Sequence, residues 1–209
     1  MRDYIAAIRK ARGDRPVALV LQAWNWEPLN YGKRGYPTPE ESRFMAYQAV
    51  VHGAKALLYY GQYRCTRPNS AASLWSEATD PVVKEREFKQ CQELNAWFWE
   101  QHRDFFQELK QASRIFVLSD QKENAITLSS KTPAVEMLVK QSKDQQYVVA
   151  VNAGKDPVDA EFVLPVGLKA QEMHVLFDGR KIKVSGDKFK DRFPGYGVHV
   201  YSTTGELPE

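Results

Sequence analysis

The sequence predicts an α/β segment followed by an all-β segment, and three observations support this fold class. Two short, continuous apolar runs in the first half are typical of parallel strands buried on both faces. Helical patterns lie before, between and after these runs, which is the order of βα units. After about Arg114 the apolar residues recur at every second position in short segments, which is typical of antiparallel strands.

Length and composition are those of a globular protein. The 209 residues, 43% of them hydrophobic and 26% charged, suffice for one large domain or two moderate domains with their own cores. The net charge is +3 and basic residues are interspersed with acidic ones, so a nucleic acid partner is not expected. Apolar runs are too short to span a membrane. The N-terminus lacks the apolar stretch of a signal peptide, and the cellular location stays open.

Cysteine and histidine usage predicts neither a metal site nor a cofactor. Cys65 and Cys91 form no CxxC pair and have no histidine nearby in the sequence. The four histidines lie far apart in the chain. Cys91 falls on the apolar side of a predicted helix, where a thiol usually packs in the core.

The first predicted elements are a helix and a strand. Residues 2–12 place Tyr4, Ile5 and Ile8 at helical spacing, and Gly13 is a typical stop after a helix. The run "PVALVLQAW" follows as the first buried strand, and it leads into the polar loop "NWEPLNYGKRGYP".

A second helix begins with strong local signals. Thr38 is a typical N-cap, Pro39 stands at the first helical position, and Glu41 completes a capping box. The run "AKALLYY" is the second strand, and Asp80 precedes the longest helix, predicted over about residues 81–111. These elements make up a first unit, residues 1–113.

The second unit, residues 114–209, is predicted to be an antiparallel β-sandwich. Turn signals such as Asp178-Gly179 and Gly186-Asp187 separate its short segments. Eight of these segments have strand character: "IFVLS", "AITLSS", "VEMLVKQ", "QYVVAVNA", "AEFVLP", "MHVLF", "KIKVS" and "GVHVYS".

Several of these motifs together resemble bacterial glycoside hydrolases. The strand "RPVALVLQAW", the stretch "PTPEESRFMAYQAVVHGAKALLYYGQY" and the ending "FKDRFPGYGVHVYS" are similar to the last part of a (β/α)8 barrel and the small β-sandwich that follows it. The resemblance covers nearly the whole chain, and residues 37–60 are its most specific piece. It implies that the two strands are the seventh and eighth of a barrel, and that residues 81–111 form its eighth helix.

The resemblance conflicts with the length of the first unit. A complete barrel of this type takes about 250 residues, and two strands cannot close one. We therefore expect a fragment of a longer protein whose missing N-terminal portion covers the exposed strand edges. Two alternatives stay open, namely a homo-oligomer that completes the sheet and a different fold.

Glycoside hydrolysis usually requires two carboxyl groups that project from the carboxyl ends of different barrel strands. The resemblance implies an acid/base after strand four, which this chain lacks, and a nucleophile after strand seven. Glu27 is the only carboxylate near that second position, but it lies several residues past the strand. Gln22 occupies the more typical place, so we favour a solvated loop carboxylate over a catalytic one for Glu27.

Substrate-binding candidates are the polar and aromatic side chains that follow the two strands, because flat rings stack on sugars and amides or guanidinium groups bind their hydroxyls. They are Gln22, Trp24, Trp26, Tyr59, Tyr63 and Arg64. Tyr59 and Tyr60 point to opposite sides of a strand, so only one of them is expected to face the barrel interior.

The sequence thus predicts part of a glycoside hydrolase-like protein that contributes one side of a sugar-binding cleft. Because one carboxylate is missing, we expect no hydrolysis by the chain alone, and its status as an enzyme stays open. The alternatives are a non-catalytic carbohydrate-binding protein and a self-assembling structural protein.

Overall fold

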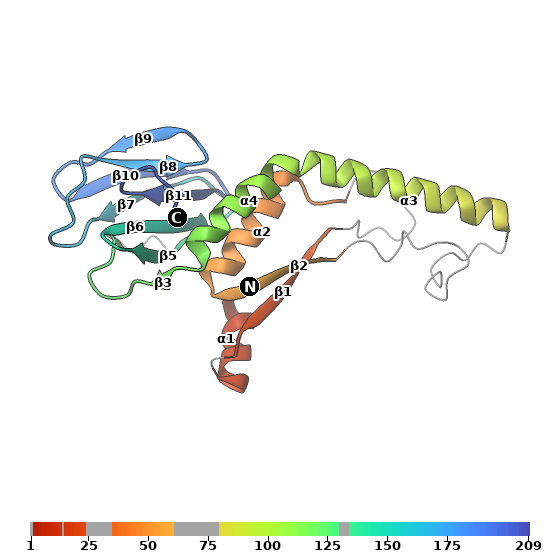
Figure 1. The fold of residues 1–209 in the computed structure, drawn as a ribbon, viewed down its shortest axis with the longest axis horizontal. Coiled ribbons are helices and arrows are strands. Elements are labelled where there is room, and N and C mark those ends of the chain that lie inside the picture. The colour runs from red at the N-terminus through yellow and green to blue at the C-terminus, as the bar shows by residue number, and fades with distance from the viewer. Residues whose placement is uncertain (1, 14, 24–34, 61–79, 130–133) are drawn as a thin grey trace.

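The computed structural model describes residues 2–13, 15–23, 35–60, 80–129 and 134–209 (Figure 1). Helices and parallel strands come first, as predicted. They are α1 (Arg2–Arg12), β1 (Val17–Gln22), α2 (Pro39–Val51), β2 (Ala54–Tyr60), α3 (Pro81–Gln101) and α4 (Arg103–Phe116). Strands β1 and β2 pair in parallel, which is consistent with a partial α/β unit.

The start of α2 has the predicted capping box. The side chain of Thr38 accepts a hydrogen bond from the backbone N–H of Glu41, and the backbone N–H of Thr38 donates to the Glu41 carboxylate. Reciprocal capping satisfies two backbone donors that a helix otherwise leaves without partners. Residues within its first turn therefore determine where α2 begins.

The predicted single helix over residues 81–111 is wrong, because the chain forms two helices that meet at His102. The ring of His102 donates from Nδ1 to the carbonyl oxygen of Phe98 at 2.8 Å, and its Nε2 lies 2.9 Å from Oγ of Ser42 on α2. Both partners of this second contact are buried. A carbonyl oxygen can only accept, so Nδ1 carries the proton of the neutral ring and Nε2 is the acceptor. The hydroxyl of Ser42 therefore donates to Nε2. This pair ties the junction of α3 and α4 to α2.

Within residues 117–129 and 134–209 the structure has nine strands, which form two antiparallel sheets. They are β3 (Ser119–Asp120), β4 (Thr127–Leu128), β5 (Val135–Ser142), β6 (Gln145–Asn152), β7 (Val158–Val163), β8 (Glu172–Leu176), β9 (Arg180–Lys183), β10 (Lys188–Phe193) and β11 (Val198–Ser202). One sheet has the order β3-β5-β6-β11-β8-β9 and the other the order β10-β7-β4.

The strand prediction needs correction at one predicted segment and at one strand that it missed. Most of "IFVLS" is not a strand, because α4 continues to Phe116, where the ring packs edge-on against Tyr47 of α2. Strand β10 was not predicted, because the charged residue Asp191 occupies an inward position of "KFKDRF" and interrupts the alternation of apolar and polar residues. Its inward side chains are Phe189, Asp191 and Phe193.

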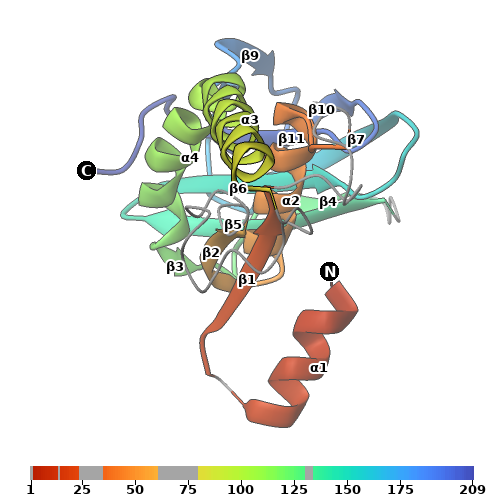
Figure 2. The ribbon, with the colours of Figure 1, turned by 90° about the vertical axis from the view of Figure 1, so that its right-hand side faces the viewer.

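The two central strands of the six-stranded sheet, β6 and β11, are buried on both faces. Strand β6 shows this most clearly, because Val148 and Ala150 contribute to a core shared with the three-stranded sheet. Tyr147, Val149 and Val151 contribute to a second core with α2, α4 and β1. Figure 2 shows α2 and α4 lying over this sheet. The two predicted units are therefore joined by a continuous apolar core.

Candidate functional site

The carboxyl ends of β1 and β2 meet at one edge of their small sheet. In the parallel register Leu21 pairs with Tyr59 and Gln22 with Tyr60, and the backbone N–H of Ala23 donates to the carbonyl oxygen of Tyr60 at 3.1 Å. Ligands of parallel α/β proteins bind at the carboxyl ends of the strands. This edge therefore stays the candidate site.

One side chain at this edge is held by a backbone contact. Nε2 of Gln22 donates to the carbonyl oxygen of Gly35 at 3.2 Å. This bond joins the end of β1 to the segment that leads into α2. The amide of Gln22 is thus positioned rather than free to rotate.

The two tyrosines at the end of β2 have different environments. The ring of Tyr59 contacts Trp99 and Phe106 of α3 and α4, at centroid distances of 6.4 and 5.1 Å. Burial raises the pKa of Tyr59, and its hydroxyl has no hydrogen-bond partner within the described residues. Tyr60 is 47% exposed on the other side of the strand. Tyr59 therefore faces the helices, and Tyr60 faces the open side of the sheet.

The remaining predicted site residues lie outside the described residues. Glu27, Trp24 and Trp26 fall in residues 24–34, and Tyr63 and Arg64 fall in residues 61–79.

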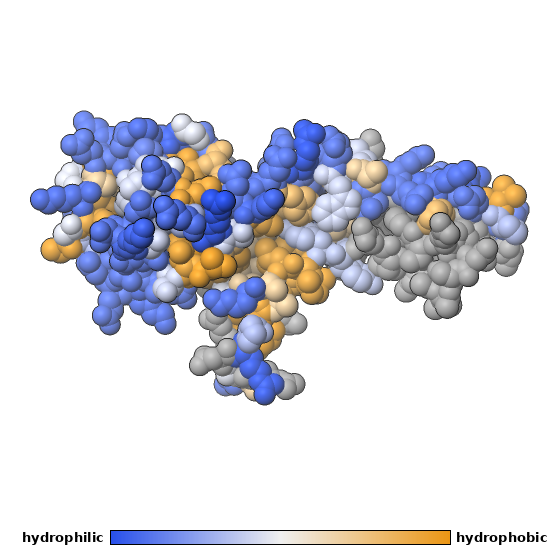
Figure 3. All heavy atoms as spheres, viewed as in Figure 1, coloured by the Kyte–Doolittle hydropathy of each residue, from blue (hydrophilic) through white to orange (hydrophobic). Residues whose placement is uncertain are grey.

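The open side of the parallel pair is apolar. Val20 is 59% exposed and Leu58 is 54% exposed, and the two are partners in the strand register. Ala18 and Ala56 lie beside them on the same side and are also exposed. Figure 3 shows apolar side chains at the place where β1 and β2 lie in Figure 1. We call these four residues the open face.

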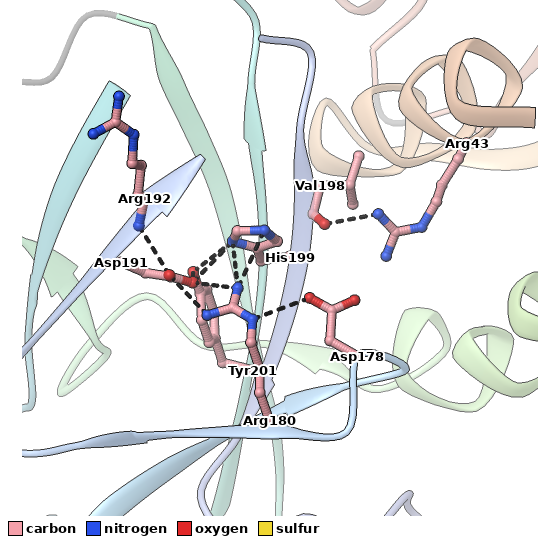
Figure 4. A network of polar contacts seen from close by, with 8 residues as sticks. All are labelled: Arg43, Asp178, Arg180, Asp191, Arg192, Val198, His199 and Tyr201. Carbon is pink, nitrogen blue, oxygen red and sulfur yellow. Dashed lines mark hydrogen bonds and ion pairs between the residues drawn. The ribbon is translucent and has the colours of Figure 1, made fainter. Parts of the chain in front are cut away.

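The most extensive polar network lies elsewhere, between the two antiparallel sheets (Figure 4). Arg180 of β9 donates twice to the carboxylate of Asp191 on β10, at 2.8 Å each. His199 and Tyr201 of β11 contact the same carboxylate, at 2.9 and 2.7 Å. Burial raises the pKa of Asp191, but hydrogen bonds from His199, Arg180 and Tyr201 outweigh burial and hold its pKa well below the usual range.

This network is structural. The side chains of Asp191 and His199 are 7% and 9% exposed, and their polar atoms bind one another. Strand β10 belongs to one sheet, and β9 and β11 belong to the other, so the contacts link the two sheets. The sequence offered one signal for it, the Asp178-Gly179-Arg180 turn that starts β9.

The Ser42–His102 pair has the geometry of a nucleophile and its base. Ser42 is 0% exposed and His102 is 1% exposed, so a substrate cannot reach either group. Within the described residues, no group of three or more His, Cys, Asp or Glu side chains is arranged to hold a metal ion. No helix among these residues is long and apolar enough to cross a membrane.

Comparisons with known proteins give structural neighbours only. No protein-family model and no curated protein sequence matches the chain. AmyP in complex with maltose is similar over 99% of this chain, with 9% identity and a TM-score of 0.52, and the match covers 45% of that protein. A second AmyP structure, in complex with maltotriose, gives 10% identity and a TM-score of 0.50 over 99% of this chain and 44% of that one.

An α-amylase from Geobacillus thermoleovorans, complexed with acarbose, matches over 99% of this chain and 42% of its own length, with 15% identity and a TM-score of 0.47. The chain thus spans less than half of the length of each of these structures. At such low identity the likeness concerns the fold alone, which this chain shares with part of the AmyP structures.

Proposed function

We propose that this chain is part of a glycoside hydrolase-like, carbohydrate-active protein and forms one side of its sugar-binding cleft. Residues 1–113 would supply the seventh and eighth strands of a (β/α)8 barrel, and residues 114–209 its C-terminal β-sandwich. The parallel pairing of β1 with β2 supports the first assignment. The two antiparallel sheets around a common core support the second.

The open face is the observation that carries this proposal. Inside a (β/α)8 barrel, the inward side chains of each strand pack against those of the other strands. Val20 and Leu58 are aliphatic side chains of the kind that fill such interiors, yet more than half of each is exposed. We infer that further parallel strands, beyond the two described here, cover this face.

Sugar contacts are proposed at the carboxyl edge of the open face. Gln22 and Tyr60 are register partners there, and an amide beside a phenol can bind sugar hydroxyls and stack on a pyranose ring. Trp24, Trp26, Tyr63 and Arg64 follow in sequence as further candidates. Tyr59 was a candidate on sequence grounds, but its contacts with α3 and α4 favour a packing role, and Tyr60 replaces it in the proposal.

Hydrolysis is not proposed for the chain alone. Of the two carboxyl groups that the reaction usually needs, the one candidate near the end of the first predicted strand is Glu27. The test is an assay of the 209-residue chain against a panel of aryl α- and β-glycosides, with α-glucosides first because AmyP was crystallised with maltose. We expect no turnover above that of the buffer. Turnover that Glu27→Gln abolishes would show that the chain holds a complete catalytic pair and would contradict the proposal.

Self-assembly is a second candidate, and the open face is again the observation that favours it. Two copies could bury Val20 and Leu58 against each other, as exposed apolar patches commonly do. Sedimentation velocity distinguishes the cases, since a dimer that Leu58→Lys converts to a monomer would favour assembly. A monomer at high concentration would exclude it.

A further inference from the structure

A surface groove lies between α2, α4 and the turn that joins β8 to β9. It has a volume of about 370 Å³, which is within the usual range for small-ligand sites. Its lining includes Arg43 of α2, Gln107 and Gln111 of α4, and Phe177 of the turn. None of its lining residues belongs to β1 or β2, so it is separate from the edge where the sugar contacts are proposed.

Two residues that line the groove, Arg43 and Glu108, form an ion pair. Nε of Arg43 donates to both carboxylate oxygens of Glu108, at 2.8 and 3.0 Å, and Nη1 donates to the carbonyl oxygen of Val198 at 2.7 Å. Tyr47 also donates to Glu108, at 2.6 Å. Within the described part of the chain, Nη2 of Arg43 has no hydrogen-bond partner. The pair therefore offers fixed N–H donors beside a carboxylate that is already held in place.

An aromatic residue lines the same groove under backbone strain. Phe177 has a φ of 70°, in the left-handed region that bulky residues rarely adopt. Such strain costs about 1–3 kcal/mol and persists where the surrounding structure compensates for it. The ring packs in part against the core that α2 and α4 share with the six-stranded sheet. Phe177 thus brings an apolar ring to a groove that Pro39 and Phe105 also line.

We propose that this groove binds a neutral oligosaccharide, at a site separate from the cleft. Each sugar hydroxyl both donates and accepts hydrogen bonds, and the groove offers donors on Arg43 together with two mixed donor–acceptor amides, Gln107 and Gln111. The apolar face of a pyranose ring packs on an aromatic ring such as Phe177. Glu40, Asp104 and Glu108 outnumber the single arginine, which disfavours an anionic ligand. The proposal rests on the proposed carbohydrate function.

The test is a titration of the ¹⁵N-labelled 209-residue chain with maltoheptaose and, separately, cellohexaose, followed by amide chemical shifts. We expect at least one sugar to shift the amides of Gln107, Gln111 and Phe177. Phe177→Ala should weaken binding about tenfold, because it removes part of an apolar contact. The double variant Gln107→Ala/Gln111→Ala should weaken it about threefold to tenfold and leaves the fold intact, since alanine favours helix.

Controls separate this site from the proposed cleft. Val166→Ala, at a side chain that is 96% exposed outside the groove, should leave the affinity unchanged. Tyr60→Ala should abolish shifts at the β1–β2 edge and leave those of Gln107 and Gln111 intact. The proposal is overturned if neither sugar shifts the groove amides, or if the double glutamine variant binds as tightly as Val166→Ala. It is also overturned if a trilysine peptide shifts these amides and the sugars do not, which would indicate a basic peptide ligand.

Discussion

Removing the hydroxyl of Ser42 tests how the junction of α3 and α4 is held. Nδ1 of His102 donates to the carbonyl oxygen of Phe98, which fixes the tautomer and leaves Nε2 as an acceptor. In Ser42→Ala this buried Nε2 loses the hydroxyl that donates to it. A buried polar atom without a partner costs about 1–3 kcal/mol. In a chain of this length each kcal/mol lowers the melting temperature by about 2–4 °C. We therefore expect a decrease of about 2–12 °C.

The assay is thermal unfolding followed by circular dichroism, with three further variants. Ser113→Ala is the matched control, because this serine lies on the exposed side of α4 and its hydroxyl contacts only the carbonyl of Lys110. The double variant Ser42→Ala/His102→Phe removes both polar partners, so it should be more stable than the sum of Ser42→Ala and His102→Phe predicts. An unchanged melting temperature in Ser42→Ala, or strictly additive effects, would refute the reasoning.

Three further predictions concern the sheets. Gly195→Ala places a Cβ atom 1.9 Å from the carbonyl oxygen of Lys155, so it should lower the free energy of unfolding in urea by about 1–3 kcal/mol or more. Gly154→Ala is the control and should cost less, because the nearest neighbours of its Cβ are side-chain atoms at 3.3 Å. The depressed pKa of Asp191 means that its ion pairs stabilise the fold above about pH 4 and lose this effect as the pH falls further. In urea unfolding, the decrease in the free energy of unfolding from pH 6 to pH 3 should therefore be smaller for Asp191→Asn than for the unsubstituted protein. Leu58→Lys on the open face should change the free energy of unfolding by less than about 0.5 kcal/mol, and a larger loss would mean that this side chain is buried in solution.

The elements that the sequence predicted well are those with local signals. The capping box of Thr38 and Glu41 located the start of α2, and the continuous apolar runs located β1 and β2. Alternation along β2 also predicted that Tyr59 and Tyr60 face opposite ways. Each of these features depends on neighbours within a few residues, so the sequence alone carries the information.

The elements that sequence analysis missed depend on distant contacts. The break at His102 is stabilised by Ser42, which lies 60 residues earlier, and the amphipathic pattern continues across it. Strand β10 contains Asp191 at an inward position, where a partner such as Arg180 on another strand is needed to bury the charge. The groove at Phe177 combines residues from α2, α4 and a turn, and no local motif joins them.

The most direct test of the proposed function is a sugar titration read at the carboxyl edge of β1 and β2. Linear α- and β-linked oligosaccharides would be added to the ¹⁵N-labelled chain, and the amide signals of Gln22 and Tyr60 would be followed. We expect at least one sugar to shift both signals in a saturable manner, and Tyr60→Ala to abolish the response at Gln22. If the spectrum shows a folded chain and no sugar shifts the amide signal of Gln22 or that of Tyr60, the result would contradict a sugar-binding cleft at this edge.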